Sequence, residues 1–150
     1  MSLETEVMSL MKDAMKNKDE AVLRGLRAIK AEIIKAKTEP GANGEISADI
    51  ELKLLQKLVK QRKDSLAIYE QQNRADLASK EVEEIAVIER FLPAQMSEAD
   101  IKAAVQAIIA QVGAAGPQDL GKVMGMATKQ LAGKADGKVI SEMAKGLLSH

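Results

Sequence analysis

The segment Phe91-Leu-Pro-Ala-Gln-Met-Ser-Glu-Ala-Asp100 separates two stretches of helical sequence and decides how the chain is organised. Proline disfavours helical geometry in the residue before it, so the helix that leads towards Pro93 is expected to end there. Ser97, followed three residues later by Asp100, is typical of a capping box at the start of the next helix. The segment therefore predicts a boundary between two helical subdomains at Pro93.

Apolar residues recur at helical spacing on both sides of this boundary, and short polar turns join the helical stretches. The predicted fold class is all-α, with a four-helix N-terminal subdomain (residues 1–92) and a three-helix C-terminal tail subdomain (residues 93–150). In the first, we expect a helix with the stripe Leu3, Val7, Leu10 and Ala14, one capped by Asp19, one from Ser47, and one after a break near Asn73. In the second, we expect a helix from Ser97 to Gly113, one with Pro117 in its first turn and its end at Gly133, and one capped by Asp136.

The composition favours helix packing and excludes several kinds of site. Hydrophobic residues make up 46% of the chain but aromatic residues only 1%, so the cores must be aliphatic. So few aromatic rings argue against recognition of single-stranded nucleic acid by base stacking. The chain has no cysteine, and its one histidine, His150, is interpreted as a frayed end. Thiol nucleophiles, Cys/His zinc sites and an imidazole base are therefore not expected.

The charge balance and the absence of apolar runs bear on partners and location. The net charge is zero, so no global field draws the chain to nucleic acid or to an anionic membrane. The N-terminal residues Met-Ser-Leu-Glu-Thr-Glu lack the apolar core of a signal peptide, and no apolar run reaches membrane-spanning length. We expect a cytoplasmic protein without a membrane partner. The sequence does not predict the oligomeric state.

The sequence matches no enzyme template. Gly121-Lys122 is followed by Val123, whereas a P-loop needs a longer glycine-spaced loop and a Ser or Thr after the lysine. Glu83 and Glu84 are adjacent, so they project from different parts of a helix surface, unlike paired catalytic carboxylates. We predict no catalytic residue, no metal ligand and no cofactor, and we expect no catalysis by this chain alone.

The stretches Asp119-Leu-Gly-Lys-Val-Met-Gly125 and Gly133-Lys-Ala-Asp-Gly-Lys138 are rich in glycine and lysine. Glycine inside a helix costs about 1 kcal/mol relative to alanine, and Gly121 and Gly125 share one helical face. Two interpretations of this face stay open: it packs tightly against another helix, or it lets a polyanion approach the backbone. We predict that Gly125 packs internally and that Gly121 lies nearer the surface.

Basic residues mark two candidate surfaces. The first surrounds these glycines and contains Lys122, Lys129, Lys134 and Lys138. The second is the stripe Lys53, Lys57, Lys60 and Lys63, within a segment that holds five basic residues and no acid. The residues favour a solvated face for this stripe, balanced by Glu81, Glu83 and Glu84.

Arg62 occupies an unusual position on the same expected helix. It falls among Leu55, Val59 and Leu66, which form the apolar face. A guanidinium group there should pair with a carboxylate on the helix that contains residues 81–84. The alternative is that Arg62 extends to the rim of the core and meets an external anion.

Several segments in this order closely resemble the YqeY-like proteins, and the resemblance spans nearly the whole chain. The segments are Lys60-Gln-Arg-Lys-Asp-Ser65, Arg74-Ala-Asp-Leu-Ala-Ser-Lys-Glu81, Phe91-Leu-Pro-Ala-Gln95, Asp119-Leu-Gly-Lys-Val-Met-Gly125 and Ala135-Asp-Gly-Lys-Val139. That family is similar to the C-terminal tail region of GatB, the B subunit of the tRNA-dependent glutamine amidotransferase. In that enzyme the tail contacts tRNA, whereas the carbon–nitrogen ligase activity, with glutamine as amido-N-donor, resides in a domain that is absent from this chain.

The resemblance implies a non-catalytic helical module associated with tRNA and linked to the amidotransferase. The residues that it implies for nucleic-acid contact are Lys122, Lys129, Lys134 and Lys138, with Gly121, Gly125, Gly133 and Gly137 between them, and the stripe from Lys53 to Lys63 is the secondary candidate. The alternative is an adaptor that docks on an amidotransferase or an aminoacyl-tRNA synthetase through a Met-rich helical face, without contact to nucleic acid. An independent enzyme is the third and least favoured hypothesis.

Overall fold

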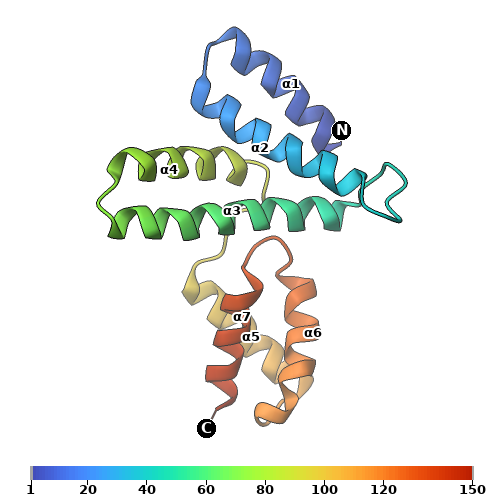
Figure 1. The fold of residues 1–150 in the computed structure, drawn as a ribbon. Helices are drawn as coiled ribbons and strands as arrows, with labels where there is room; N and C mark the ends of the chain where they lie inside the picture. The colour runs from blue at the N-terminus through green and yellow to red at the C-terminus, as the bar shows by residue number, and fades with distance from the viewer. Residues whose placement is uncertain (1, 150) are drawn as a thin grey trace. The chain divides into compact units, whose positions relative to one another are not determined.

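The computed structural model describes residues 2–149, so the interpretation of His150 lies outside the described residues. Within them the chain forms seven α-helices and one 3-10 helix and no strand, which confirms the all-α prediction (Figure 1). No helix among residues 2–149 is long and apolar enough to cross a bilayer. The helices are α1 (Leu3–Lys16), α2 (Glu20–Lys37), α3 (Ala48–Gln71), α4 (Ala75–Glu89), α5 (Glu98–Val112), the 3-10 helix η1 (Pro117–Asp119), α6 (Leu120–Gln130) and α7 (Gly137–Leu148).

Local capping chemistry sets most of the helix starts. Asp19 accepts a hydrogen bond from the Val22 amide, and Ser47 accepts one from the Ile50 amide. The Ser97 hydroxyl accepts from the amide of Asp100 in the same way. Each of these bonds satisfies one of the free N–H groups at a helix N-terminus. The starts predicted at Asp19, Ser47, Ser97 and Asp136 are confirmed.

Contacts between Cα atoms group the chain into two compact units, one up to Leu92 and one from Pro93 onward. In the first unit, α3 pairs with α4, α1 pairs with α2, and α2 also packs against α3 and α4. The core is aliphatic, with Leu26, Ile29, Ile33 and Ile88 almost fully buried.

Gly25 sets the close approach of α2 to α4. A Cβ atom at Gly25 would lie only 2.7 Å from Cβ and Cγ1 of Val87. Real Cβ atoms do not approach other carbon atoms so closely, so the two helices can be this near only because Gly25 has no side chain.

Arg62 is paired inside the first unit, as expected. Its Nε lies 3.4 Å from Oε1 of Glu84 on α4, and its Nη1 donates to the Leu58 carbonyl at 3.2 Å. Both charged side chains are only 18% exposed. Burial, and then the nearby carboxylate of Glu84, raises the pKa of Glu81 above its ordinary value, although Arg62 opposes the shift.

The second unit is a three-helix arrangement in which α5, α6 and α7 each contact the other two. Its core contains Val105, Val123, Ala127 and Ala144, all with no exposed surface. Gly113 adopts the left-handed conformation (φ 68°) and ends α5, as predicted.

The sixth helix is shorter than predicted. Pro117 begins the 3-10 turn η1, so α6 starts at Leu120, and α6 ends at Gln130 rather than at Gly133. After Gln130 the chain continues as a turn that directs Leu131 and Ala135 into the core, where each is 5% exposed. Burial of these two side chains accounts for the early end of the helix.

Candidate nucleic-acid interface

The glycines of α6 lie on its solvent face. Val123 and Ala127 define the inner face, and Gly125 lies two residues from each, about 200° around the helix. A Cβ atom at Gly121 or Gly125 would meet no heavy atom within 4 Å, and both residues are exposed. The prediction that Gly125 packs internally is therefore wrong, because the buried residues of α6 lie on the side of the helix opposite to Gly125. Tight packing within the described residues does not explain either glycine.

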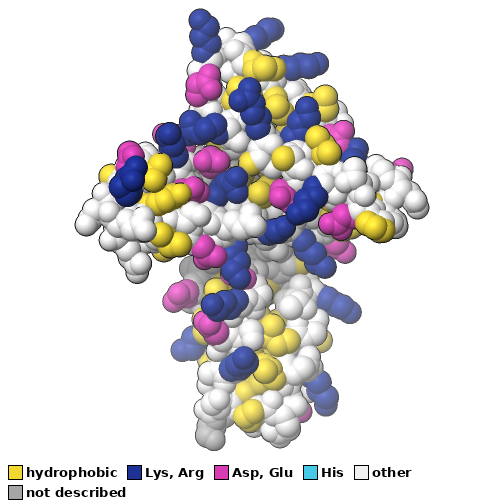
Figure 2. Space-filling model, in the orientation of Figure 1, with side chains coloured by type: hydrophobic (Ala, Val, Ile, Leu, Met, Phe, Trp, Pro, Cys, Tyr) yellow, Lys and Arg dark blue, Asp and Glu magenta, His cyan; other side chains and the backbone are white. Residues whose placement is uncertain are grey.

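Lysine side chains lie along one side of this open face. Lys122 and Lys129 are exposed and lie seven residues apart, so they project from one side of α6 about 10 Å from each other along its axis. A third lysine, Lys134, follows in the turn after α6. Residues 120–135 thus contain three lysines and no acid. Figure 2 shows the α6 side of this unit with basic side chains and very few carboxylates. The second unit is nearly neutral as a whole, so this basic character is local.

The turn after α6 is held firmly to the segment that precedes α5. The side-chain amide of Gln95 donates to the Gly133 carbonyl at 2.8 Å, and the Met96 amide donates to the Lys134 carbonyl at 3.0 Å. Gly133 itself is buried with φ 76°, so it shapes the turn and does not lie on the exposed face. The side chain of Lys134 is exposed.

The start of α7 is capped by an acidic side chain of its own unit. The Asp136 carboxylate accepts from the Lys138 amide at 3.1 Å, so the cap is satisfied within the chain. Gly137 and Lys138 are both exposed, and a Cβ at Gly137 would meet no neighbour. The charge of Asp136 opposes an anion at this helix terminus, so α6 is the better candidate surface.

The secondary basic stripe on α3 is partly neutralised. Lys53, Lys57 and Lys60 are exposed along one face, whereas Lys63 lies about 80° away from Lys53 around the helix. Lys57 Nζ is 3.9 Å from a carboxylate oxygen of Glu32. On the neighbouring α2, Arg24 forms a 2.6 Å ion pair with Glu83 of α4. The stripe is therefore solvated, but its one ion pair is with Glu32, whereas Glu83 and Glu84, which we expected to balance it, pair with Arg24 and Arg62.

Thr128 was missed by sequence analysis, although its spacing from Gly121 and Gly125 could have indicated it. It is exposed beside these glycines, and its hydroxyl donates to the Met124 carbonyl at 2.8 Å. The hydroxyl is thus bonded within α6. Among residues 2–149, no group of three or more His, Cys, Asp or Glu side chains could hold a metal ion.

A family model described as "Yqey-like protein" matches residues 4–148. No curated protein matches the chain.

Proposed function

Because the chain belongs to the YqeY-like family, we propose that its C-terminal unit binds tRNA at the solvent face of α6 and serves a tRNA-dependent amidotransferase without catalysing the reaction. One observation carries the proposal: Gly121 and Gly125 lie open on this face, beside exposed lysines, with no packing role. A phosphate backbone can approach such a face closely, and the lysines supply its countercharge. The similarity of the family to the tail region of GatB supports the choice of tRNA.

Salt dependence gives the proposal a quantitative form. Each neutralised phosphate contributes about −0.9 to the slope of log K against log salt on duplex nucleic acid. Contacts from Lys122, Lys129 and Lys134 therefore give a slope no steeper than about −2.7. Between about 50 and about 200 mM salt, the affinity should fall by at most about 40-fold.

A filter-binding titration with bulk tRNA at these two salt concentrations tests the proposal. Replacing Lys122, Lys129 and Lys134 together by alanine should abolish the salt-dependent binding without unfolding the chain. The matched control replaces Lys53, Lys57 and Lys60 by alanine, which removes the same charge from α3. If the control loses binding and the α6 variant keeps it, the interface lies on α3 and our proposal fails.

A single substitution tests the open face directly. Gly125→Leu adds bulk where the backbone is exposed, so it should weaken tRNA binding while the unfolding curve shows no loss of stability. Unchanged binding by this variant would show that the glycine face is not the contact surface.

The alternative is a protein adaptor, and the methionines of the second unit favour it. Met124, Met126 and Met143 are only half-buried around the core, so they present adaptable apolar surface. An adaptor would bind an amidotransferase or an aminoacyl-tRNA synthetase and show no affinity for free tRNA. Co-sedimentation with the purified amidotransferase, in the absence of tRNA, distinguishes the two functions.

A further inference from the structure

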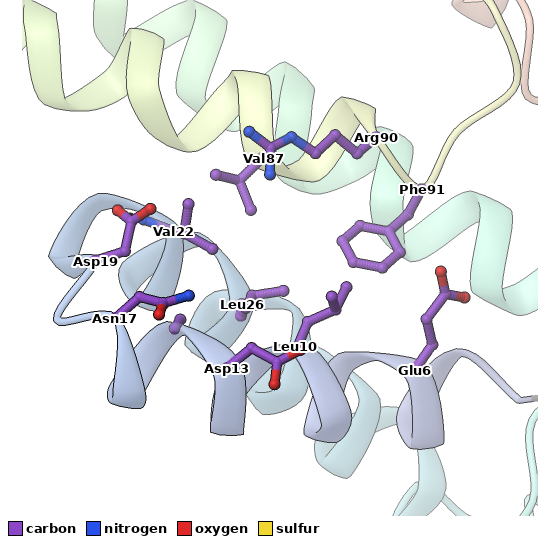
Figure 3. Close-up of a pocket in the computed structure, with 11 residues that line it drawn as sticks. Glu6, Leu10, Asp13, Asn17, Asp19, Val22, Leu26, Val87, Arg90 and Phe91 are labelled. Carbon is purple, nitrogen blue, oxygen red and sulfur yellow. The ribbon is translucent and has the colours of Figure 1, made fainter.

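The side of α1 that faces α4 is incompletely covered. Leu3, Val7 and Ala14 are buried on one stripe of this helix. Leu10 belongs to the same stripe by its spacing, yet 39% of its surface is exposed. It lines a hollow of about 210 Å³ between α1 and the end of α4, where Figure 3 shows Leu10 and Phe91 pointing towards each other. A position that helical periodicity assigns to the core is thus open.

A second hollow continues the first along the same helix. It has a volume of about 370 Å³, extends to the start of α3, and shares Glu6, Arg90 and Phe91 with the first hollow. The residues that α1 contributes to the two are spaced three and four apart, as one face of a helix. Because α1 has 14 residues, this groove follows it for about 21 Å.

The groove is acidic although the chain is neutral. The charged residues that line it are the carboxylates Glu6, Asp13, Asp19 and Glu51 and the single cation Arg90, so its net charge is 1 − 4 = −3. None of these five side chains forms an ion pair with another residue of the described chain 2–149. Asp19 only caps α2. The wall between these charges is apolar and includes Leu10, Leu52, Leu55 and Phe91.

We propose that this groove binds a basic amphipathic helix of a partner protein. Apolar side chains three and four residues apart would fill the two hollows, as in other helix-in-groove complexes, and Lys or Arg side chains would meet the carboxylates on the rim. The carboxylates are spread along the groove and do not converge as metal ligands do. An occupant with several positive charges along its length fits them better than a single ion, and the acidic rim repels nucleic acid.

A designed peptide probes this surface on the full-length chain. The probe is a fluorescein-labelled 14-residue peptide of Leu and Lys with its leucines at positions i, i+3, i+4 and i+7. The control peptide has the same composition with its leucines redistributed so that they form no stripe on a helix. We expect fluorescence anisotropy to show salt-sensitive binding of the helical probe and at least about 10-fold weaker binding of the control.

Three variants connect the binding to the groove. Asp13→Lys should weaken the affinity for the probe about 5- to 10-fold, because it removes one attraction and adds one repulsion. Glu70→Lys makes the same charge change at an exposed position outside the groove and should leave the affinity unchanged. Arg90→Glu removes the only cation of the groove and should tighten binding, a gain that misfolding cannot produce.

Three outcomes would overturn the proposal. The first is equal affinity for the two peptides. The second is an equal effect of Asp13→Lys and Glu70→Lys, which would indicate non-specific attraction. The third is a dimer in sedimentation experiments that Leu10→Glu dissociates, because a second copy of this chain would then occupy the groove.

Discussion

Replacing Gly125 by alanine should stabilise the C-terminal unit by about 1 kcal/mol. The residue lies in the middle of α6, its φ is in the ordinary negative range, and a Cβ atom there would have no heavy atom within 4 Å. The substitution therefore adds no clash and reduces the conformational entropy that the unfolded chain loses on folding. For a unit of 58 residues (93–150), this corresponds to a rise in Tm of about 4–8 °C.

Two other Gly→Ala variants serve as matched controls, because each should destabilise the protein instead of stabilising it. Gly25→Ala would place a Cβ 2.7 Å from Val87, so overpacking should destabilise the protein by about 1–3 kcal/mol. Gly113→Ala would force a side chain into the left-handed region at φ 68°, at a cost of about 1–2 kcal/mol. Thermal unfolding followed by circular dichroism at 222 nm measures all three variants against the parent. A lower Tm for Gly125→Ala would refute the open solvent face of α6.

Two further predictions concern the charged cluster of α3 and α4. Arg62→Met should lower the free energy of unfolding in urea by about 1–2 kcal/mol, because it leaves the Glu84 carboxylate half-buried without its partner. Adding Glu84→Leu should recover most of that loss, whereas additive losses from the two substitutions would contradict the pairing. Burial, and then Glu84, raises the pKa of Glu81 above the ordinary value of 4.5, so the folded chain holds this proton more tightly than the unfolded chain. The contribution of Glu81 to stability therefore falls as the pH rises from 4.5 through the raised pKa. Glu81→Gln should increase Tm at pH 7, and this gain should vanish below pH 4.5. A gain in Tm of equal size at both pH values would exclude the raised pKa as its cause.

Most of the helices could be predicted because their ends depend on local chemistry. A hydroxyl or carboxylate such as Ser97 or Asp19 caps whichever amides follow it in sequence, and Gly113 permits a left-handed residue wherever it occurs. The pairing of Arg62 with Glu84 was also predictable, because a guanidinium on an apolar face needs a carboxylate within reach. The early end of α6 could not be predicted from the sequence, because it depends on burial of Leu131 against other helices.

The orientation of α6 and the groove on α1 depend on tertiary packing. Methionines lie on both sides of α6, at Met124 and Met126, so the spacing of Gly121 and Gly125 did not reveal which side faces the core. Leu10 fits the core stripe of α1 by periodicity, and only the position of α4 leaves it exposed. A repeat in sequence specifies which residues share a face, whereas the neighbouring elements determine whether that face is covered.

The turns of the first unit place side chains where the backbone would suit glycine better. Lys18, Asn43 and Asn73 have φ values of 54°, 53° and 56°, one in each connection between consecutive helices from α1 to α4. Lysine in particular has little tolerance for this region. In α6 the reverse holds, because Gly121 and Gly125 occupy positions where almost any residue would fit. The backbone therefore does not require these two glycines, and a functional requirement for them would act on the smoothness of that surface instead. A deep mutational scan read out by growth, set beside one read out by folding alone, would separate those two requirements at Gly125.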